Sequence, residues 1–287
     1  MTQEGVALGR MLFFDTRLSA NNQISCASCH QPELAFSDNK SFSSGHSGQL
    51  LNRNTPPLFN LTWSESFFWD GGVKNLESLS FTALMNPHEM GSDLSQLCQQ
   101  LNEDKNYSSA FKKAFGIDSV SSAYVSRALA QYMRTLISAN SKYDSVQQNL
   151  AQFSNQELKG QVVFKNNCAS CHQPPLFTDN QFHHNGLKQY FSSDDLSLTT
   201  GRFRITRDSS DLGKYKTPSI RNLSRTAPFM HDGRFNTIDE VLTHYQNLDP
   251  MNQLQDSLVR VIRFSDVEKE DLKIFMKTLE GRPTRTR

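Results

Sequence analysis

Hydrophobic positions recur along most of the chain at helical spacing, and no stretch shows the sustained alternation of a β-strand. The longest helical pattern runs from about Ser92 to Tyr143. Its clearest apolar stripe consists of Tyr124, Ala128, Tyr132 and Leu136. The segment from Ser41 to Pro57 is instead rich in Gly, Ser, Asn and Pro, which predicts a long irregular loop. We therefore expect a mainly α fold with long irregular loops.

Three capping boxes predict where helices begin. In such a box a Ser or Thr side chain accepts a hydrogen bond from the backbone three residues on, and a Glu there accepts one from the backbone of the Ser or Thr. The three pairs are Ser154 with Glu157, Thr237 with Glu240, and Ser265 with Glu268. The apolar spacing extends these helices through Phe164, Tyr245 and Leu279, respectively. A further short helix is expected from Gly5 to Phe14.

One pentapeptide, Cys-Ala-Ser-Cys-His, occurs twice, at residues 26–30 and 168–172. C-x-x-C-H is the attachment signature of c-type haem. Two thiols at this spacing can each bond one vinyl group of the porphyrin, and the adjacent His can then ligate the iron. Zinc knuckles are the alternative, but zinc ribbons set their C-x-x-C halves about 15–20 residues apart. We therefore predict two covalently bound haem c groups, held by Cys26, Cys29, His30, Cys168, Cys171 and His172.

The residues that precede the two pentapeptides also repeat. Gly9 and Phe13 stand before the first as Gly160 and Phe164 stand before the second. The shared pattern indicates an internal repeat of two units, each a helix followed by a haem motif.

Chain length agrees with a duplication, because 287 residues suit two domains of ordinary size. We place an N-terminal haem c domain at residues 1–150 and a C-terminal haem c domain at residues 151–287. The linker is expected around residues 148–153.

Composition excludes two classes of partner. The chain has 30 Lys and Arg against 29 Asp and Glu, so it lacks the basic footprint of a nucleic-acid-binding protein. No run approaches the 18 apolar residues of a membrane span. One basic stretch, from Gly201 to Arg234, is either a solvated face or a set of partners for the haem propionates.

Cysteine usage bears on the compartment. Four of the five Cys belong to the haem motifs, which leaves almost nothing for disulfides. Residues 1–30 lack the charged-then-apolar pattern of a signal peptide. Because c-type haem is attached outside the bacterial cytoplasm, we expect a periplasmic protein whose signal peptide has been removed from this sequence.

Ordered sequence blocks between about Leu8 and Leu279 resemble the bacterial di-haem cytochrome c peroxidase family, which includes the tryptophan-tryptophylquinone-forming enzyme MauG. Besides the two pentapeptides, the blocks are Leu12-Phe13-Phe14-Asp15, Arg53-Asn54-Thr55-Pro56, Phe68-Trp69-Asp70-Gly71, Glu89-Met90-Gly91, Arg221-Asn222, Thr226-Ala227-Pro228 and His231-Asp232-Gly233. The resemblance implies two cytochrome c-like haem domains, of which the N-terminal one, residues 1–150, is peroxidatic and the C-terminal one, residues 151–287, transfers electrons.

By this resemblance His30 is the proximal ligand of the haem that reacts with peroxide. Glu89 matches the catalytic acid–base residue that moves a proton between the two peroxide oxygens. His46 matches a distal iron ligand that blocks this haem in some members and is generally missing from MauG-like ones; an ordinary loop His is the alternative. The sequence departs from the family at Ala83, where a Pro is usual, and at Leu79, where a Gln is common.

The resemblance makes His172 the proximal ligand of an electron-transfer haem. Tyr245 stands where the usual peroxidases carry a distal Met, and it is the residue type found there in MauG. A phenolate ligand favours ferric and higher states, so the second haem is expected to have a low potential. His244 is the alternative ligand, and because helix neighbours point about 100° apart, only one of the two can face the iron.

Two further sites are implied by the resemblance. Trp69 matches a catalytic Trp that carries charge between the haems, although a buried Trp more often fills a core. Asn54, Thr226 and Pro228 match residues whose oxygens bind an inter-haem Ca2+, and ligation by oxygen alone suits calcium.

The leading functional expectation is a di-haem peroxidase. It would reduce hydrogen peroxide to water at the N-terminal haem, with electrons relayed through the C-terminal haem from a small periplasmic cytochrome c or cupredoxin. Tyr245 motivates the alternative, a MauG-like oxidase that modifies a partner protein through a bis-ferryl state. A third hypothesis is a non-enzymatic di-haem electron carrier, which has no use for Glu89. The resemblance leaves open a homodimer.

Overall fold

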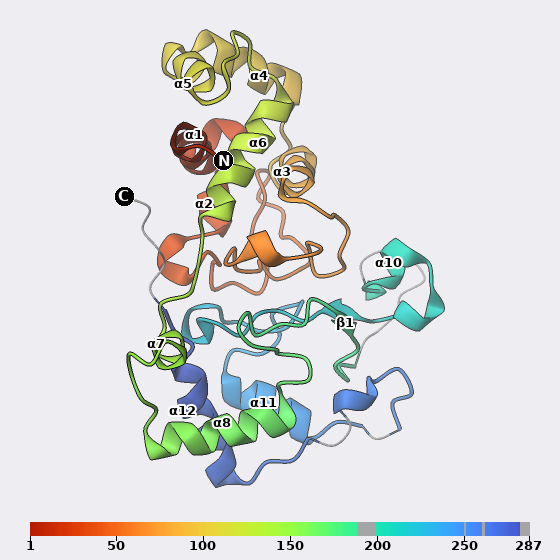
Figure 1. Ribbon diagram of the computed structural model, residues 1–287. Coiled ribbons are helices and arrows are strands. Elements are labelled where there is room, and N and C mark those ends of the chain that lie inside the picture. The colour runs from red at the N-terminus through yellow and green to blue at the C-terminus, as the bar shows by residue number, and fades with distance from the viewer. Residues whose placement is uncertain (189–198, 250, 260–261, 282–287) are drawn as a thin grey trace. The chain divides into compact units, whose positions relative to one another are not determined.

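Short helices joined by long irregular segments build the chain (Figure 1). The computed structural model describes residues 1–188, 199–249, 251–259 and 262–281. The protein is mainly α-helical, as predicted, and no helix among the described residues is long and apolar enough to cross a bilayer. The helices are α1 (Gln3–Phe14), α2 (Cys26–Cys29), α3 (Leu76–Met85), α4 (Leu94–Glu103), α5 (Lys105–Phe115), α6 (Ser122–Arg134), α7 (Lys142–Gln147), α8 (Asn155–Asn167), α10 (Phe203–Thr206), α11 (Ile238–Gln246) and α12 (Asp266–Lys277).

Strand structure in the described part of the chain is one short antiparallel pair together with isolated bridges. In the pair β1 (Phe182–His183) lies beside β2 (Tyr215–Lys216), with Phe182 opposite Lys216. Strands of two residues are too short to show an alternating pattern, which is why the sequence did not indicate them. Single 3-10 turns complete the structure: η1 (Thr16–Leu18), η2 (Pro32–Leu34), η3 (Leu61–Trp63), η4 (Ser209–Asp211), η5 (Leu223–Arg225) and η6 (Ser257–Val259).

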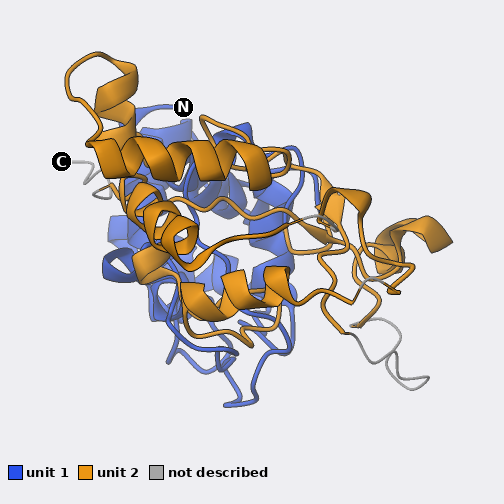
Figure 2. Ribbon diagram, turned by 90° about the horizontal axis from the view of Figure 1, so that it is seen from below, with its two compact units in different colours: residues 1–67, 73–137, 283–287 blue, residues 68–72, 138–282 orange. Residues whose placement is uncertain are grey.

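Two compact units divide the described chain (Figure 2). The first unit comprises residues 1–67 and 73–137, and the second comprises residues 68–72 and 138–281. Each unit has its own hydrophobic core. A short segment from the first half of the sequence therefore belongs structurally to the second unit.

The division falls between residues 137 and 138, whereas the sequence analysis placed it between residues 150 and 151. The difference lies in α7, which packs within the second unit. Tyr143 of α7 belongs to the core of that unit, and Asp144 forms an ion pair with Arg221. Neither contact is visible in the local pattern of the sequence.

A glycine allows the helices in each unit to cross at close range. In the first unit α1 packs against α6, and a Cβ atom at Gly9 would collide with the carbonyl oxygen of Ala128. In the second unit α8 packs against α12, and a Cβ atom at Gly160 would collide with the carbonyl oxygen of Asp271. The repeated glycines of the sequence thus occupy equivalent packing positions, where no larger residue fits.

All three predicted capping boxes are present in the structure. Ser154 caps α8, Thr237 caps α11 and Ser265 caps α12. The last helix ends at Lys277 rather than at Leu279, although Leu279 is buried in the second core. The boxes fix helix starts well because both of their hydrogen bonds are local.

The helical pattern predicted from Ser92 to Tyr143 is divided among α4, α5, α6 and α7. Asp104 ends α4 and caps α5, because its carboxylate accepts hydrogen bonds from the backbone of Asn106 and Tyr107 at 2.8 and 3.3 Å. Gly116 ends α5 in the left-handed conformation, with φ of 70°. Periodicity alone does not reveal these breaks, since buried apolar residues continue on both sides of them.

Candidate haem sites

The first four residues of the first pentapeptide form one helical turn, α2, and His30, the fifth residue, caps its C-terminal end. The Nδ1 atom of His30 lies 2.9 Å from the carbonyl oxygen of Phe36. A carbonyl can only accept a hydrogen bond, so Nδ1 carries the proton and the lone pair of the ring is on Nε2. This is the form of imidazole that ligates a metal, with its orientation fixed by the bond at the other nitrogen.

The second pentapeptide follows α8 as a turn rather than as a helix of its own, but its histidine is held in the same way. The Nδ1 atom of His172 donates to the carbonyl oxygen of Phe177 at 3.2 Å. Burial lowers the pKa of both His30 and His172, against the hydrogen bonds that raise it, and so favours the neutral rings. Both histidines therefore have a neutral, oriented ring whose Nε2 lone pair can ligate iron.

The thiols of the two pentapeptides form no disulfide. Burial raises the pKa of Cys26 and of Cys168 to about 12. Each pentapeptide thus offers two unpaired thiols and one neutral imidazole, which is the donor set that covalent attachment of haem c requires. The residues present fit a haem at each motif.

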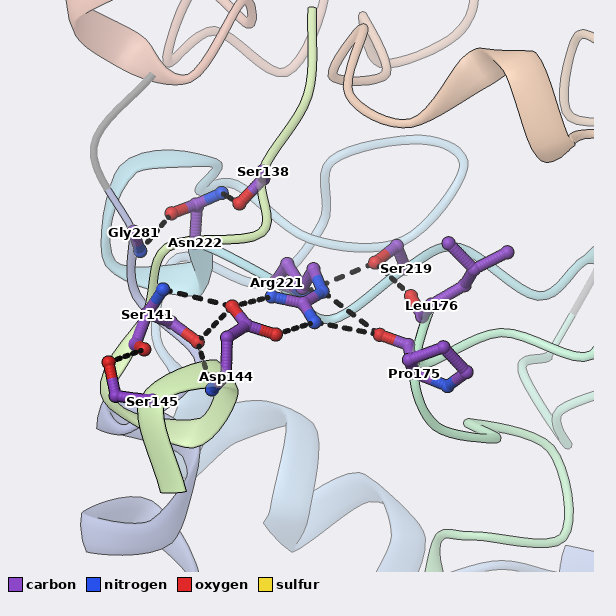
Figure 3. A network of polar contacts seen from close by, with 10 residues as sticks. All are labelled: Ser138, Ser141, Asp144, Ser145, Pro175, Leu176, Ser219, Arg221, Asn222 and Gly281. Carbon is purple, nitrogen blue, oxygen red and sulfur yellow. Dashed lines mark hydrogen bonds and ion pairs between the residues drawn. The ribbon is translucent and has the colours of Figure 1, made fainter. Parts of the chain in front are cut away.

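A buried ion pair holds the backbone that follows the second pentapeptide (Figure 3). Arg221 donates to both carboxylate oxygens of Asp144, at 2.7 and 2.9 Å. The same guanidinium donates to the carbonyl oxygen of Pro175 at 2.8 and 3.1 Å. These bonds secure the turn between His172 and Phe177, and the carbonyl at the end of that turn orients the imidazole.

Glu89 lies on the loop that follows α3, in the same unit as the first pentapeptide. Burial raises the pKa of Glu89 to about 7, although a hydrogen bond from Asn86 works in the opposite direction. The negative charge of Glu89 contributes, after burial, to the raised pKa of both Cys26 and Cys29. A carboxyl group that exchanges its proton near neutral pH is therefore close to the first haem motif.

His46 packs against the loop that carries Glu89. Its backbone nitrogen donates to the carbonyl oxygen of Glu89 at 2.8 Å, and its Nε2 lies 3.0 Å from the carbonyl oxygen of Pro87. Gly91 provides the space for the ring, since a Cβ atom there would collide with the imidazole. Ligation of iron by Nε2 would require the bond to Pro87 to break, so the ligand role of His46 stays a prediction.

Tyr245 and His244 make different contacts on α11. The Nε2 atom of His244 donates to the backbone carbonyl of Asn185 at 3.0 Å. Burial raises the pKa of Tyr245, and the charges of the Cys168 and Cys171 thiolates raise it further. The phenol therefore lies beside the second haem motif, while the imidazole bonds a loop. Tyr245 as the distal ligand, with His244 as the alternative, stays a prediction.

Asn185 itself was not singled out by the sequence analysis. Its side chain hydrogen-bonds to the phenol of Tyr245, which lowers the pKa of that group against the larger effect of burial. Its Nδ2 atom also lies 3.3 Å from the sulfur of Met230. Position next to two histidines was the one signal in the sequence, and it did not indicate this role.

His183 lies between two carboxylates in the second unit. Its Nε2 lies 2.8 Å from Asp179 and its Nδ1 lies 2.6 Å from Asp256. Burial by itself lowers the pKa of His183, but the two carboxylates outweigh this effect and raise it. His183 also forms, with Asp179 and Cys171, a group of metal-binding type within 4.8 Å, yet both ring nitrogens already bond carboxylates. We read this cluster as structural.

Trp69 lies on the segment of residues 68–72 that belongs to the second unit. Its carbonyl oxygen accepts a hydrogen bond from the backbone nitrogen of Lys216 at 2.8 Å. The adjacent Asp70 is completely buried and accepts a bond from Nε of Arg204 at 2.9 Å. Arg202 donates to the carbonyl oxygen of Asp70 at 2.9 Å. The backbone on both sides of the indole is thus held by the second unit.

These contacts also account for part of the basic stretch between Gly201 and Arg234. Arg204 pairs with Asp70, and Arg221 pairs with Asp144. These two cations therefore have carboxylate partners within the protein.

The predicted calcium ligands belong to different units. Asn54 lies in the first unit, where its Nδ2 donates to the carbonyl oxygen of Lys40 at 2.9 Å. Thr226 and Pro228 lie in the second unit, and the Ala227–Pro228 peptide bond is cis. Calcium at these residues stays a prediction.

Comparison with known proteins decides the family. Residues 3–152 match the family model described as di-haem cytochrome c peroxidase. The chain belongs to the di-haem cytochrome c peroxidase family. Membership implies two haem c groups, in agreement with the donor sets described above.

The similarity to individual members of the family extends over almost the whole chain. The methylamine utilization protein MauG of Methylorubrum extorquens is 34% identical over 287 residues, covering 99% of this chain and 80% of the relative. The cytochrome c551 peroxidase of Nitrosomonas europaea is 33% identical over 276 residues, covering 96% of this chain and 79% of the relative. A solved structure, a MauG-like protein associated with microbial copper homeostasis, has 31% identity and a TM-score of 0.90, covering 98% of this chain and 90% of the other.

Proposed function

We propose that this protein reduces hydrogen peroxide to water at a haem bound by the first pentapeptide. Electrons come from a small periplasmic cytochrome c or cupredoxin through a haem bound by the second. The observation that carries the proposal is the buried carboxyl group of Glu89, with a pKa of about 7, close to Cys26 and Cys29.

Glu89 is suited to the proton transfers of this reaction. A haem held by Cys26, Cys29 and His30 would supply the iron for cleavage of the O–O bond of peroxide. As a carboxylate, Glu89 accepts the proton of one peroxide oxygen, and as an acid it returns a proton to the oxygen that leaves as water. A group with a pKa near the working pH can do both, whereas an exposed Glu would stay ionised.

The test is the oxidation of a reduced cytochrome c by peroxide, compared between the wild type and Glu89→Gln. Loss of an acid–base group is expected to lower the rate about 10²- to 10⁴-fold. Glu103→Gln, at an exposed position of α4, is the matched control and should keep the wild-type rate. Equal rates for wild type and Glu89→Gln would instead fit the non-enzymatic electron carrier.

Tyr245 favours a second candidate function. A phenolate ligand lowers the reduction potential of a haem relative to Met, and a low-potential haem accepts electrons poorly from a donor of higher potential. The oxidising equivalents would then be used on a side chain of a partner protein, as in a MauG-like oxidase. The similarity to MauG proteins at 34% identity is consistent with this use.

The two candidates differ in what peroxide does to the fully oxidised protein in the absence of a donor. The oxidase predicts a long-lived absorption band in the near infrared after one equivalent of peroxide. The peroxidase predicts no such species and rapid turnover with reduced cytochrome c or cupredoxin. Immediate bleaching of the haems would argue against the oxidase.

The proposed compartment is the periplasm, where small electron donors diffuse and where bacteria attach c-type haem. Ca2+ at Asn54, Thr226 and Pro228 is part of the same proposal. Removal of Ca2+ by a chelator should then slow reduction of peroxide, and addition of Ca2+ should restore the rate. An unchanged rate in metal-free buffer would remove calcium from the proposal.

A further inference from the structure

Two segments of the chain, residues 55–83 and residues 217–245, have the same local structure with no insertion or deletion between them. Each begins with Thr-Pro, as Thr55-Pro56 and as Thr217-Pro218. The backbone carbonyl of each proline is a hydrogen-bond partner of the histidine of its own motif. The correspondence thus begins at the proximal side of both haem sites.

The match continues through the middle of the segments. Asn60 and Asn222 both have left-handed backbones, with φ of 56° and 60°, and each precedes a 3-10 turn. An isolated antiparallel bridge then closes a tight loop in both segments. The bridges join Phe67 to Val73 and Phe229 to Phe235.

The two closed loops also share their unusual backbone conformations. Phe68 and Met230 have φ of 63° and 75°, and the glycines three residues later, Gly71 and Gly233, have φ of 73° and 61°. Left-handed non-glycine residues are uncommon, so their recurrence at corresponding positions fixes the alignment of the segments.

Each segment ends in a helix with the same kind of cap. Asn75 caps α3 and Thr237 caps α11, and both side chains accept a bond from the backbone three residues on. Ser80 of α3 and Leu242 of α11 are buried at corresponding positions. The next corresponding pair on this face is Ala83 and Tyr245.

Ala83 therefore occupies, in the first unit, the position from which the phenol of Tyr245 approaches the second haem motif. A methyl group contains no donor atom and cannot ligate iron. The carboxyl group that lies near the first motif comes instead from Glu89, on the loop after α3. The backbone is repeated between the units, but the side chain at the distal position is not.

We propose that Ala83 is the residue that leaves the distal position of the first haem open to a small oxidant. The proposal rests on the proposed function in one respect, that a haem is bound at each motif. One substitution in a repeated scaffold thus separates a reactive haem from an electron-transfer haem. Introducing a ligating side chain at residue 83 should therefore occupy the distal coordination position of the first haem.

The test is the spin state of the two ferric haems, followed by electron paramagnetic resonance and absorption spectroscopy. The wild type is expected to show one high-spin and one low-spin haem. Ala83→Tyr and Ala83→His, each of which adds a donor atom, should convert the high-spin signal to low spin or shift it to that of a bound phenolate. Ala83→Leu, which adds bulk without a donor, is the matched control and should leave the first haem without a protein ligand on its distal side.

Haem content and thermal unfolding of each variant show that it is folded. The proposal is overturned if both folded donor variants keep the wild-type high-spin signal, or if the wild type has two low-spin haems. A failure of the proposed function alone would give a different result. The spin states of the variants would change as expected, but the wild type would show no peroxidase turnover.

Discussion

The Nδ2 atom of Asn86 donates a hydrogen bond to Oε1 of Glu89 at 2.9 Å. Burial raises the pKa of Glu89 to about 7 in spite of this bond. The first proton transfer in the proposed reaction needs the carboxylate, which is present above the pKa. We therefore expect the rate of reaction with peroxide to rise with pH through about 7 and to fall at lower pH. Rapid-mixing measurements from pH 5 to 9 would show this, and Glu89→Gln should abolish the dependence.

Asn86 offers a way to move this pH dependence. Its hydrogen bond favours the ionised form of Glu89, so removal of the bond in Asn86→Ala should raise the pKa of Glu89 further. The midpoint of the rate profile should shift to higher pH, with little change in the plateau. The measurement is the same pH series. A profile that keeps its midpoint would show that another group limits the reaction.

The ion pair of Arg221 with Asp144 should contribute strongly to stability, because the Arg221 side chain is only 3% exposed. Removal of one partner of a buried pair leaves the other charge uncompensated, which costs about 3–5 kcal/mol. Arg221→Met is therefore expected to lower the free energy of unfolding by that amount in denaturant titrations. Arg207→Met, at an exposed position, should change it by less than about 0.5 kcal/mol. A loss below about 1 kcal/mol for Arg221→Met would contradict this account.

One pair of substitutions can show whether Tyr245 or His244 is the distal ligand of the second haem. Tyr245→Phe removes the hydroxyl group and keeps the ring, so the second haem should lose its distal ligand and become high-spin. His244→Gln should leave that ligation unchanged, because His244 bonds the carbonyl oxygen of Asn185. Resonance and absorption spectra of the ferric proteins report both outcomes. The opposite pattern would make His244 the ligand.

His183 should make stability depend on pH. Its pKa is raised in the folded protein by Asp256 and Asp179, against the lowering effect of burial. The contribution of protonated His183 to the free energy of unfolding is complete below the pKa of about 6.5 in the unfolded chain. It is lost as pH rises through the pKa in the folded protein. His183→Gln should thus cost about 1.5–3 kcal/mol at pH 6 and clearly less at pH 9. Thermal unfolding at pH 6 and pH 9 would show the difference, with His88→Gln at an exposed position as the control. An equal loss of stability at the two pH values would show that the charge of His183 does not stabilise the fold.

The features that the sequence predicted correctly depend on neighbouring residues. The capping boxes at Ser154, Thr237 and Ser265 gave the helix starts because each box is complete within four residues. The family was equally accessible, since its motifs are short and ordered along the chain. The predicted roles of the individual site residues remain to be tested by the experiments described above.

Features that depend on distant residues were not predicted. The segment around Trp69 joins the second unit because Asp70 is bonded by Arg204, and nothing local to either residue indicates that pairing. Asp256 likewise reaches His183 from a loop far along the chain. The near-neutral pKa of Glu89 comes from burial, which the sequence of a polar loop does not reveal.

Because residues 68–72 belong to the second unit, the C-terminal half of the protein is incomplete when it is expressed alone. A fragment that starts at residue 138 would lack Asp70, the buried acceptor of Arg204, and would present Arg202 without the two carbonyl groups that it now binds. Supplying a short peptide that spans residues 66–74 should therefore improve the yield of the isolated C-terminal half.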